Sequence, residues 1–182
     1  MSRRASSAVL SVYDHLDERE RAGVLMALLD ERSELQAEVE CLAAALLGNV
    51  RVESVAVEVR SALVEFELAE LAVRAGRQPA RGYVHETDAA YDLVEGAMRP
   101  FVADLHRRAR LGMHEAAATL ALGVLTGLYR CGDPRDGTVL DYAGTDTPEE
   151  LAASVISEAA KAQVELTPAA VVAACPDWDR MC

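Results

Sequence analysis

Apolar residues recur three and four positions apart along most of the chain, a spacing typical of amphipathic helices. The first such stretch covers residues 17–31 and begins at Asp17, an N-cap residue followed by two glutamates in the first turn. Ser33, with a glutamine three positions later, forms a capping box for a second helix, and Gly48 ends that helix in a left-handed turn. Because so short a connection brings neighbouring helices together, residues 17–47 predict an antiparallel αα-hairpin.

The next periodic stretch, residues 53–75, is apolar on two faces, which predicts one long helix packed between two neighbours. Glycines and a proline in residues 76–86 exclude a helix there and indicate a connector. Thr87 is the expected N-cap of the following helix. The apolar spacing carries across Pro100, so residues 88–110 predict one kinked helix rather than two.

Residues 114–130 form the most apolar predicted helix, and it carries Gly123 and Gly127 on one face. Glycine disfavours helix by about 1 kcal/mol relative to alanine. We therefore expect a compensating close approach by a neighbouring backbone, and a central position for this helix. Two further helices are expected to start at Thr147 and Thr167, each an N-cap residue followed by proline.

Composition supports a helical class. Hydrophobic residues make up 51% of the 182 residues and aromatic residues 4%, and the charged residues are mostly glutamate and arginine, which favour helix. We expect a single all-α domain over residues 1–182. Its architecture would be six to eight helices in antiparallel αα-hairpins, arranged as a bundle or a short solenoid-like stack.

The charge balance excludes some partners. Eighteen basic against 30 acidic residues give a net charge of −12, so direct nucleic-acid binding is not expected. The longest run without a charged residue, Ala116–Tyr129, is shorter than the roughly 20 residues of a membrane span. No signal peptide or anchor is recognised, so we expect a cytoplasmic protein without membrane contact.

The loop 131–147 holds the best candidates for a cation site, because calcium needs several converging oxygen ligands. The spacing does not match an EF-hand, and turn and capping roles are favoured for these carboxylates. A zinc site formed by His85, His106 and His114 with Cys131 is the alternative, but solvated or capping histidines are favoured. No metal and no cofactor are therefore expected, and Cys41 is read as a small, at least half-buried helix residue. The candidate aspartates are Asp133, Asp136, Asp141 and Asp146.

Arginine is concentrated in the connector 76–86 and near residue 110, which suggests a surface for an anion or an acidic partner. The alternative, which we favour, is that these arginines balance acidic helices of the same molecule. The candidate partner-binding residues are Arg77, Arg81, Tyr83, His85, Arg107, Arg108 and Arg110.

Three segments together resemble an uncharacterised family of bacterial α-helical proteins, some of which also carry a SWIM-type zinc-binding domain. The segments are ALLDERSELQAEVECLAAALL, GRQPARGYVHETDAAYDLVEGAMRPFVADLHRRARLG and ALGVLTGLYRC. The resemblance covers residues 16–132 and implies stacked αα-hairpins but no activity. The zinc-binding motif, Cys-x-Cys followed by Cys-x-His, is absent from this chain.

No motif places a nucleophile beside a base. A phosphate-binding loop and a dinucleotide-binding fingerprint are also absent from the sequence. The first functional hypothesis is therefore a non-enzymatic interaction or scaffold protein that binds another protein. The second is a small-molecule- or metal-dependent enzyme. The third is an acidic mimic that occupies a nucleic-acid-binding protein, with residues 30–70 as its carboxylate-rich face. A homodimer is also compatible with the aliphatic helices.

Overall fold

The computed structural model describes residues 12–66, 68–78, 82–132, 138–176 and 178, and it confirms the all-α class: 76% of it is helical. Nine α-helices lie in these residues, more than the six to eight expected. The difference arises because residues 53–75 divide into two helices and the loop 131–147 contains a short one. The chain forms two compact units, residues 1–46 and 47–182, which we describe separately. The expected single domain over 1–182 remains a prediction.

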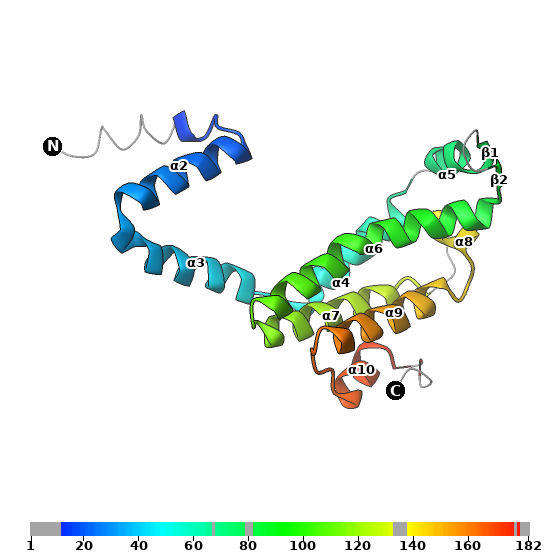
Figure 1. Ribbon diagram of the computed structural model, residues 1–182. Helices are drawn as coiled ribbons and strands as arrows, with labels where there is room; N and C mark the ends of the chain where they lie inside the picture. Colours follow the sequence, from blue (N-terminus) through cyan, green and yellow to red (C-terminus); the bar gives the residue numbers. More distant parts are fainter. Residues whose placement is uncertain (1–11, 67, 79–81, 133–137, 177, 179–182) are drawn as a thin grey trace. The chain divides into compact units, whose positions relative to one another are not determined.

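The first unit contains α2 (Glu18–Glu31), the 3-10 turn η1 (Ser33–Leu35) and all but the last two residues of α3 (Gln36–Gly48). Asp17 caps α2 as expected: its carboxylate accepts from the Glu20 amide at 2.8 Å, and the Glu20 carboxylate accepts from the Asp17 amide at 2.9 Å. Ser33 lies inside η1 instead of capping a helix. No residue of α2 or α3 is buried, and the two helices diverge from the turn (Figure 1). The expected packed hairpin is therefore wrong, because the apolar faces do not cover one another.

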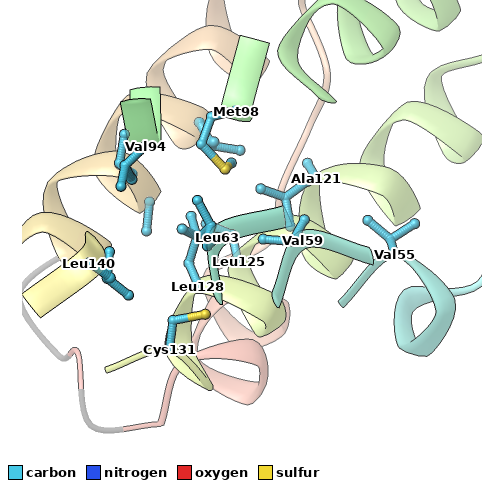
Figure 2. Packing of buried hydrophobic residues seen from close by; sticks show 14 of the residues in the cluster. Val55, Val59, Leu63, Val94, Met98, Ala121, Leu125, Leu128, Cys131 and Leu140 are labelled. Atoms are coloured by element: carbon cyan, nitrogen blue, oxygen red, sulfur yellow. The ribbon is translucent and has the colours of Figure 1, made fainter. Parts of the chain in front are cut away.

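The second unit is a bundle centred on α7 (His114–Tyr129). Helices α4 (Val52–Val64), α6 (Glu86–Arg110) and α9 (Thr147–Lys161) pack against α7 from different sides, and α10 (Pro168–Ala174) contacts it as well. Figure 1 shows α6, α7 and α9 side by side. The core is aliphatic, as the composition implies. Its largest fully buried side chains include Leu63, Leu125 and Leu128, which meet at the centre of Figure 2.

The central position predicted for α7 is confirmed at its two glycines. A methyl group added at Gly123 would lie 2.6 Å from Cβ of Val55, and one at Gly127 would lie 2.8 Å from Cβ of Val59. Since the contact moves forward along both helices together, α4 and α7 run in the same direction. The close approach was expected, but the helix that makes it lies about 70 residues earlier in the chain.

The helix expected over residues 53–75 is interrupted after Val64 and resumes as α5 (Leu68–Arg74). The break lets α5 pack on α6, where Leu71 is buried. The second apolar face is covered only in part: Val57 and Leu68 are exposed, whereas Leu71 is buried. No glycine or proline marks the break, so the sequence pattern continues across it.

The connector contains two short strands that the sequence analysis did not predict. Strands β1 (Gly76–Gln78) and β2 (Gly82–Val84) pair antiparallel, with Arg77 opposite Tyr83. The Gln78 side-chain amide donates to the carbonyls of Val73 and Arg74 at 2.9 and 3.1 Å, which satisfies the exposed end of α5. Both strands are three residues long and do not change the fold class.

Helix α6 passes through Pro100 without a break, which confirms one helix. It starts at Glu86 with His85 as N-cap, so Thr87 is not the cap. Likewise α9 has Asp146 at the N-cap, and the Thr147 hydroxyl instead donates to the carbonyl of Ala143 at 2.8 Å. That carbonyl belongs to the short helix α8 (Val139–Ala143).

The last helix follows its sequence signal. The Thr167 hydroxyl accepts from the Ala170 amide at 3.3 Å and caps α10, as predicted. Across the described residues, none of the helices combines the length and the apolar character needed to cross a membrane.

Candidate functional site

The structure divides the candidate partner-binding residues between the two ends of α6. Arg77, Tyr83 and His85 lie in the β1–β2 hairpin and at the start of α6, where the rings of Tyr83 and His85 meet edge to face at 5.1 Å. The other three arginines occupy the last turn of α6. A 25-residue helix is about 37 Å long. The two groups therefore cannot contact the same small ligand, and Arg81 lies outside the described residues.

At the end of α6, two arginines converge on one carboxylate. Asp104 accepts from Arg107 and from Arg108 at 2.9 Å each. Arg108 is buried, and it also donates to the carbonyl of Leu47. Burial raises the pKa of Asp104, but the hydrogen bonds from the two arginines outweigh it and hold the pKa below its ordinary value. Arg108 is thus engaged inside the fold, whereas Arg107 and Arg110 are exposed.

The two described candidate aspartates both lie at helix starts, but a capping hydrogen bond is present only at Asp141. Asp141 accepts from the Thr138 amide at 2.9 Å and completes a capping box at α8. Asp146 is the N-cap residue of α9. Asp133 and Asp136 lie outside the described residues. Among the residues that the structure covers, no group of three or more His, Cys, Asp or Glu side chains is placed to hold a metal ion.

The cysteines separate by burial. Cys131 and Cys175 are buried in the second unit, whereas Cys41 on α3 is exposed. The expectation that Cys41 is at least half-buried is wrong. The expectation assumed that a neighbouring helix packs against α3 at Cys41.

A groove of about 420 Å³ lies between α6 and α9, with Met98, Leu151 and Val155 as its apolar floor. At one end, His106 Nε2 and a Glu158 carboxylate oxygen are 2.7 Å apart. Glu158 also accepts from Lys161 at 2.6 Å; the hydrogen bonds from Lys161 and His106 lower the pKa of Glu158.

The ionisable side chains of the groove lie in close pairs. At the end opposite His106, Glu95 pairs with Arg99 at 3.2 Å.

The feature that the sequence analysis missed lies on the first unit. We call it the α2–α3 face: six large apolar side chains that are 40% exposed or more. The pattern of these residues was visible in the sequence, but we expected the two helices to bury them against each other. The face comprises Val24 (48% exposed), Leu25 (40%), Met26 (59%), Leu28 (43%), Leu42 (59%) and Leu46 (78%).

Comparisons with known proteins add no relative to this geometry. No family model matches the chain, and neither a curated protein nor a solved structure matches it. The resemblance to a bacterial helical family therefore stays an expectation. The function has to be argued from the residues themselves.

Proposed function

We propose that this chain is a non-enzymatic protein-interaction protein, and that the α2–α3 face is the surface that binds its protein partner. The single observation behind the proposal is that α2 and α3 bury no residue while six large apolar side chains stand exposed on them. We further propose the cytoplasm as its compartment, on the sequence grounds given above.

Helix energetics support the proposal. Isolated helices shorter than about 12–15 residues are marginal in water, and most helices in proteins are stabilised by tertiary packing of an apolar face. Helices α2 and α3 have 14 and 13 residues and no such packing in the chain as described. A partner that covers the α2–α3 face would supply it. Exposed apolar surface beyond scattered single residues marks interaction sites in soluble proteins.

Site-specific photocrosslinking tests the proposal. A photoreactive amino acid replaces Leu42 in the full chain, expressed at its natural level in its own cells. We expect covalent capture of a protein, identified by mass spectrometry. Val73, which is 77% exposed on α5 in the second unit, provides the matched control position. If position 42 captures no more protein than position 73, the α2–α3 face is not an interaction surface.

A further inference from the structure

We propose that a cavity between α5 and α6 binds a small organic anion, one that carries a carboxylate or phosphate group on a flat apolar body. The cavity lies wholly in the second unit, so the inference goes beyond the α2–α3 face and does not depend on it. Its volume is about 560 Å³, within the roughly 300–1,000 Å³ range of small-molecule pockets. Three features support the proposal: an apolar floor, two arginines in the wall, and a glycine that packing does not explain.

The apolar floor of the cavity lies where α4 gives way to α5. Phe66 lies in this break and packs, half-buried, against the core. From there the chain continues into α5, which lies beside α6 (Figure 1). Phe66 lines the cavity together with two residues of α6, buried Leu93 and half-buried Ala97. One aromatic and two aliphatic side chains can contact a ring of the ligand and remove it from water.

Two arginines from different elements line the same cavity. Arg74 lies in the last turn of α5, and Arg99 lies within α6. Among the described residues, no hydrogen bond or ion pair engages the Arg74 side chain. Arg99 pairs with Glu95 at 3.2 Å, and both side chains are exposed. An exposed pair four positions apart on a helix adds little stability, so Arg99 can exchange it for a ligand. Guanidinium groups bind carboxylates and phosphates through paired hydrogen bonds, which makes an anion the matching ligand.

The charge of the cavity wall is opposite in sign to that of the whole chain. Asp92 is the carboxylate in the described part of the lining, and it is already engaged in an interaction within the protein. Two guanidinium groups against one carboxylate leave this lining with one net positive charge, on a chain whose net charge is −12. A local excess of positive charge in a concave site attracts anions in preference to cations.

Gly96 lies within α6 at the cavity, where neither packing nor backbone conformation requires a glycine. A methyl group added there would meet nothing within 4 Å, and the residue is not in the left-handed region. Gly123 and Gly127 differ, because α4 leaves no room for a side chain at either position. Glycine disfavours helix relative to alanine, so Gly96 weakens α6 without improving its packing. Its missing side chain keeps part of the cavity wall open, where the flat face of a ligand can approach the backbone.

NMR titration of the full, isotope-labelled chain tests the proposal, with the Gly96 amide as the reporter. Benzoate and phenyl phosphate join an anionic group to a ring, benzyl alcohol keeps the ring alone, and inorganic phosphate keeps the charge alone. We expect at least one of the two ring anions to bind with a Kd of about 1 mM or tighter, as fragments of about ten non-hydrogen atoms can. Benzyl alcohol and inorganic phosphate should each bind at least about tenfold more weakly. The comparison of benzoate with phenyl phosphate identifies the anionic group that the cavity prefers.

Substitutions in the wall separate recognition of the charge from occupation of the cavity. Arg74→Gln removes the charge, so the ring anion should bind at least about tenfold more weakly, while the weak binding of benzyl alcohol should not change. Arg77→Gln is the matched control, because it removes an arginine of β1 that is not among the lining residues, and it should leave the Kd unchanged. Gly96→Leu places a side chain in the cavity and should also weaken binding about tenfold or more, followed at the amide of Ala97. Since a Cβ at position 96 meets nothing within 4 Å, this variant should fold as the parent does, which circular dichroism checks.

Several results would each overturn the inference. One is that neither ring anion shifts the Gly96 amide at about 10 mM, which is well above the expected Kd. Another is that benzyl alcohol binds as tightly as the ring anions, and a third is that Arg74→Gln and Arg77→Gln bind alike. Binding that survives Gly96→Leu in a folded variant would place the probe outside the cavity and would count equally against it. None of these results bears on the α2–α3 face, because photocrosslinking at position 42 tests the other unit.

Discussion

Replacing Gly123 by alanine should destabilise this protein, although alanine is the better helix former. The added methyl carbon would lie 2.6 Å from Cβ of Val55 and 2.9 Å from the carbonyl oxygen of Val52, both on α4. Distances below 3.0 Å do not occur for real Cβ contacts, so one helix must move. Neither contact can yield locally, because one is to backbone and the other to a β-branched side chain with a fixed rotamer.

The expected size follows from two opposing effects. Helix propensity favours alanine by about 1 kcal/mol. Overpacking a well-packed core costs about 1–3 kcal/mol, and a contact with backbone belongs at the upper end of that range. We therefore expect Gly123→Ala to lower the free energy of unfolding by about 1–2 kcal/mol. Gly127→Ala should behave alike, since its methyl group would lie 2.8 Å from Val59.

The double variant provides a sharper test of the mechanism. A single separation of α4 from α7 would relieve both clashes, because the two glycines face the same helix one turn apart. The double variant should therefore lose less unfolding free energy than the two single variants lose together. The difference should exceed the roughly 0.3–0.5 kcal/mol scatter of independent sites. Gly127→Leu, with a larger side chain at the same position, should be less stable than Gly127→Ala.

Urea unfolding followed by tryptophan fluorescence measures these losses. Trp178 is the one tryptophan of the chain, and its ring meets that of Tyr129 on α7 edge to face at 5.3 Å, so its emission reports on the second unit. A loss of 1 kcal/mol corresponds to about 2–4 °C in Tm for a chain of this size. Gly96→Ala on α6 is the control, because a methyl group there meets nothing within 4 Å. It should stabilise by up to about 1 kcal/mol. A Gly123→Ala variant as stable as the parent, with Gly96→Ala behaving as expected, would refute the reasoning.

Three further substitutions concern ion pairs of the second unit. Asp104→Asn should cost about 2 kcal/mol at neutral pH, measured by urea unfolding, because it removes the carboxylate partner of buried Arg108. Arg107→Ala, at an exposed partner, should cost less than about 1 kcal/mol. The pKa of Asp104 in the folded protein is below its ordinary value. Its contribution to stability is therefore complete at pH above the ordinary pKa and is lost as the pH falls through the folded pKa. The unfolding free energies of the parent and Asp104→Asn should converge in acid. Lys161→Ala should raise the pKa of Glu158 toward its ordinary value, as carbon-detected NMR titration would show, and an unchanged pKa would contradict the assigned cause.

Local signals were predictable where the deciding atoms are close in sequence. The caps at Asp17 and Thr167 were identified correctly, because each hydroxyl or carboxylate bonds an amide three residues on. The continuity of α6 through Pro100 followed from apolar spacing on both sides of the proline. Thr147 was misread because a hydrogen bond to Ala143, in a helix that the sequence did not suggest, takes its hydroxyl.

The candidate site was predictable only in part. Arginines were singled out by residue type, but burial of Arg108 and its bonds to Asp104 and Leu47 depend on how the end of α6 packs. The apolar residues of α2 and α3 were recognised as an interface pattern. Apolar periodicity identifies which face of a helix is hydrophobic, but not which other helix packs against that face. The exposure of the apolar residues of α2 and α3 could therefore not be predicted from their spacing.

The sequence by itself determined the helical class and the position of the most closely packed helix. Helix propensity, capping residues and a pair of glycines four positions apart act over one or two helical turns. The residues involved are neighbours in the sequence, so their effects can be predicted from it. Tertiary structure decided which helix fills the Gly123–Gly127 surface, where the chain turns between α4 and α5, and which apolar residues stay exposed. Those outcomes depend on competition among apolar faces far apart in sequence, and burial is non-directional, so the pattern of one helix cannot specify its partner.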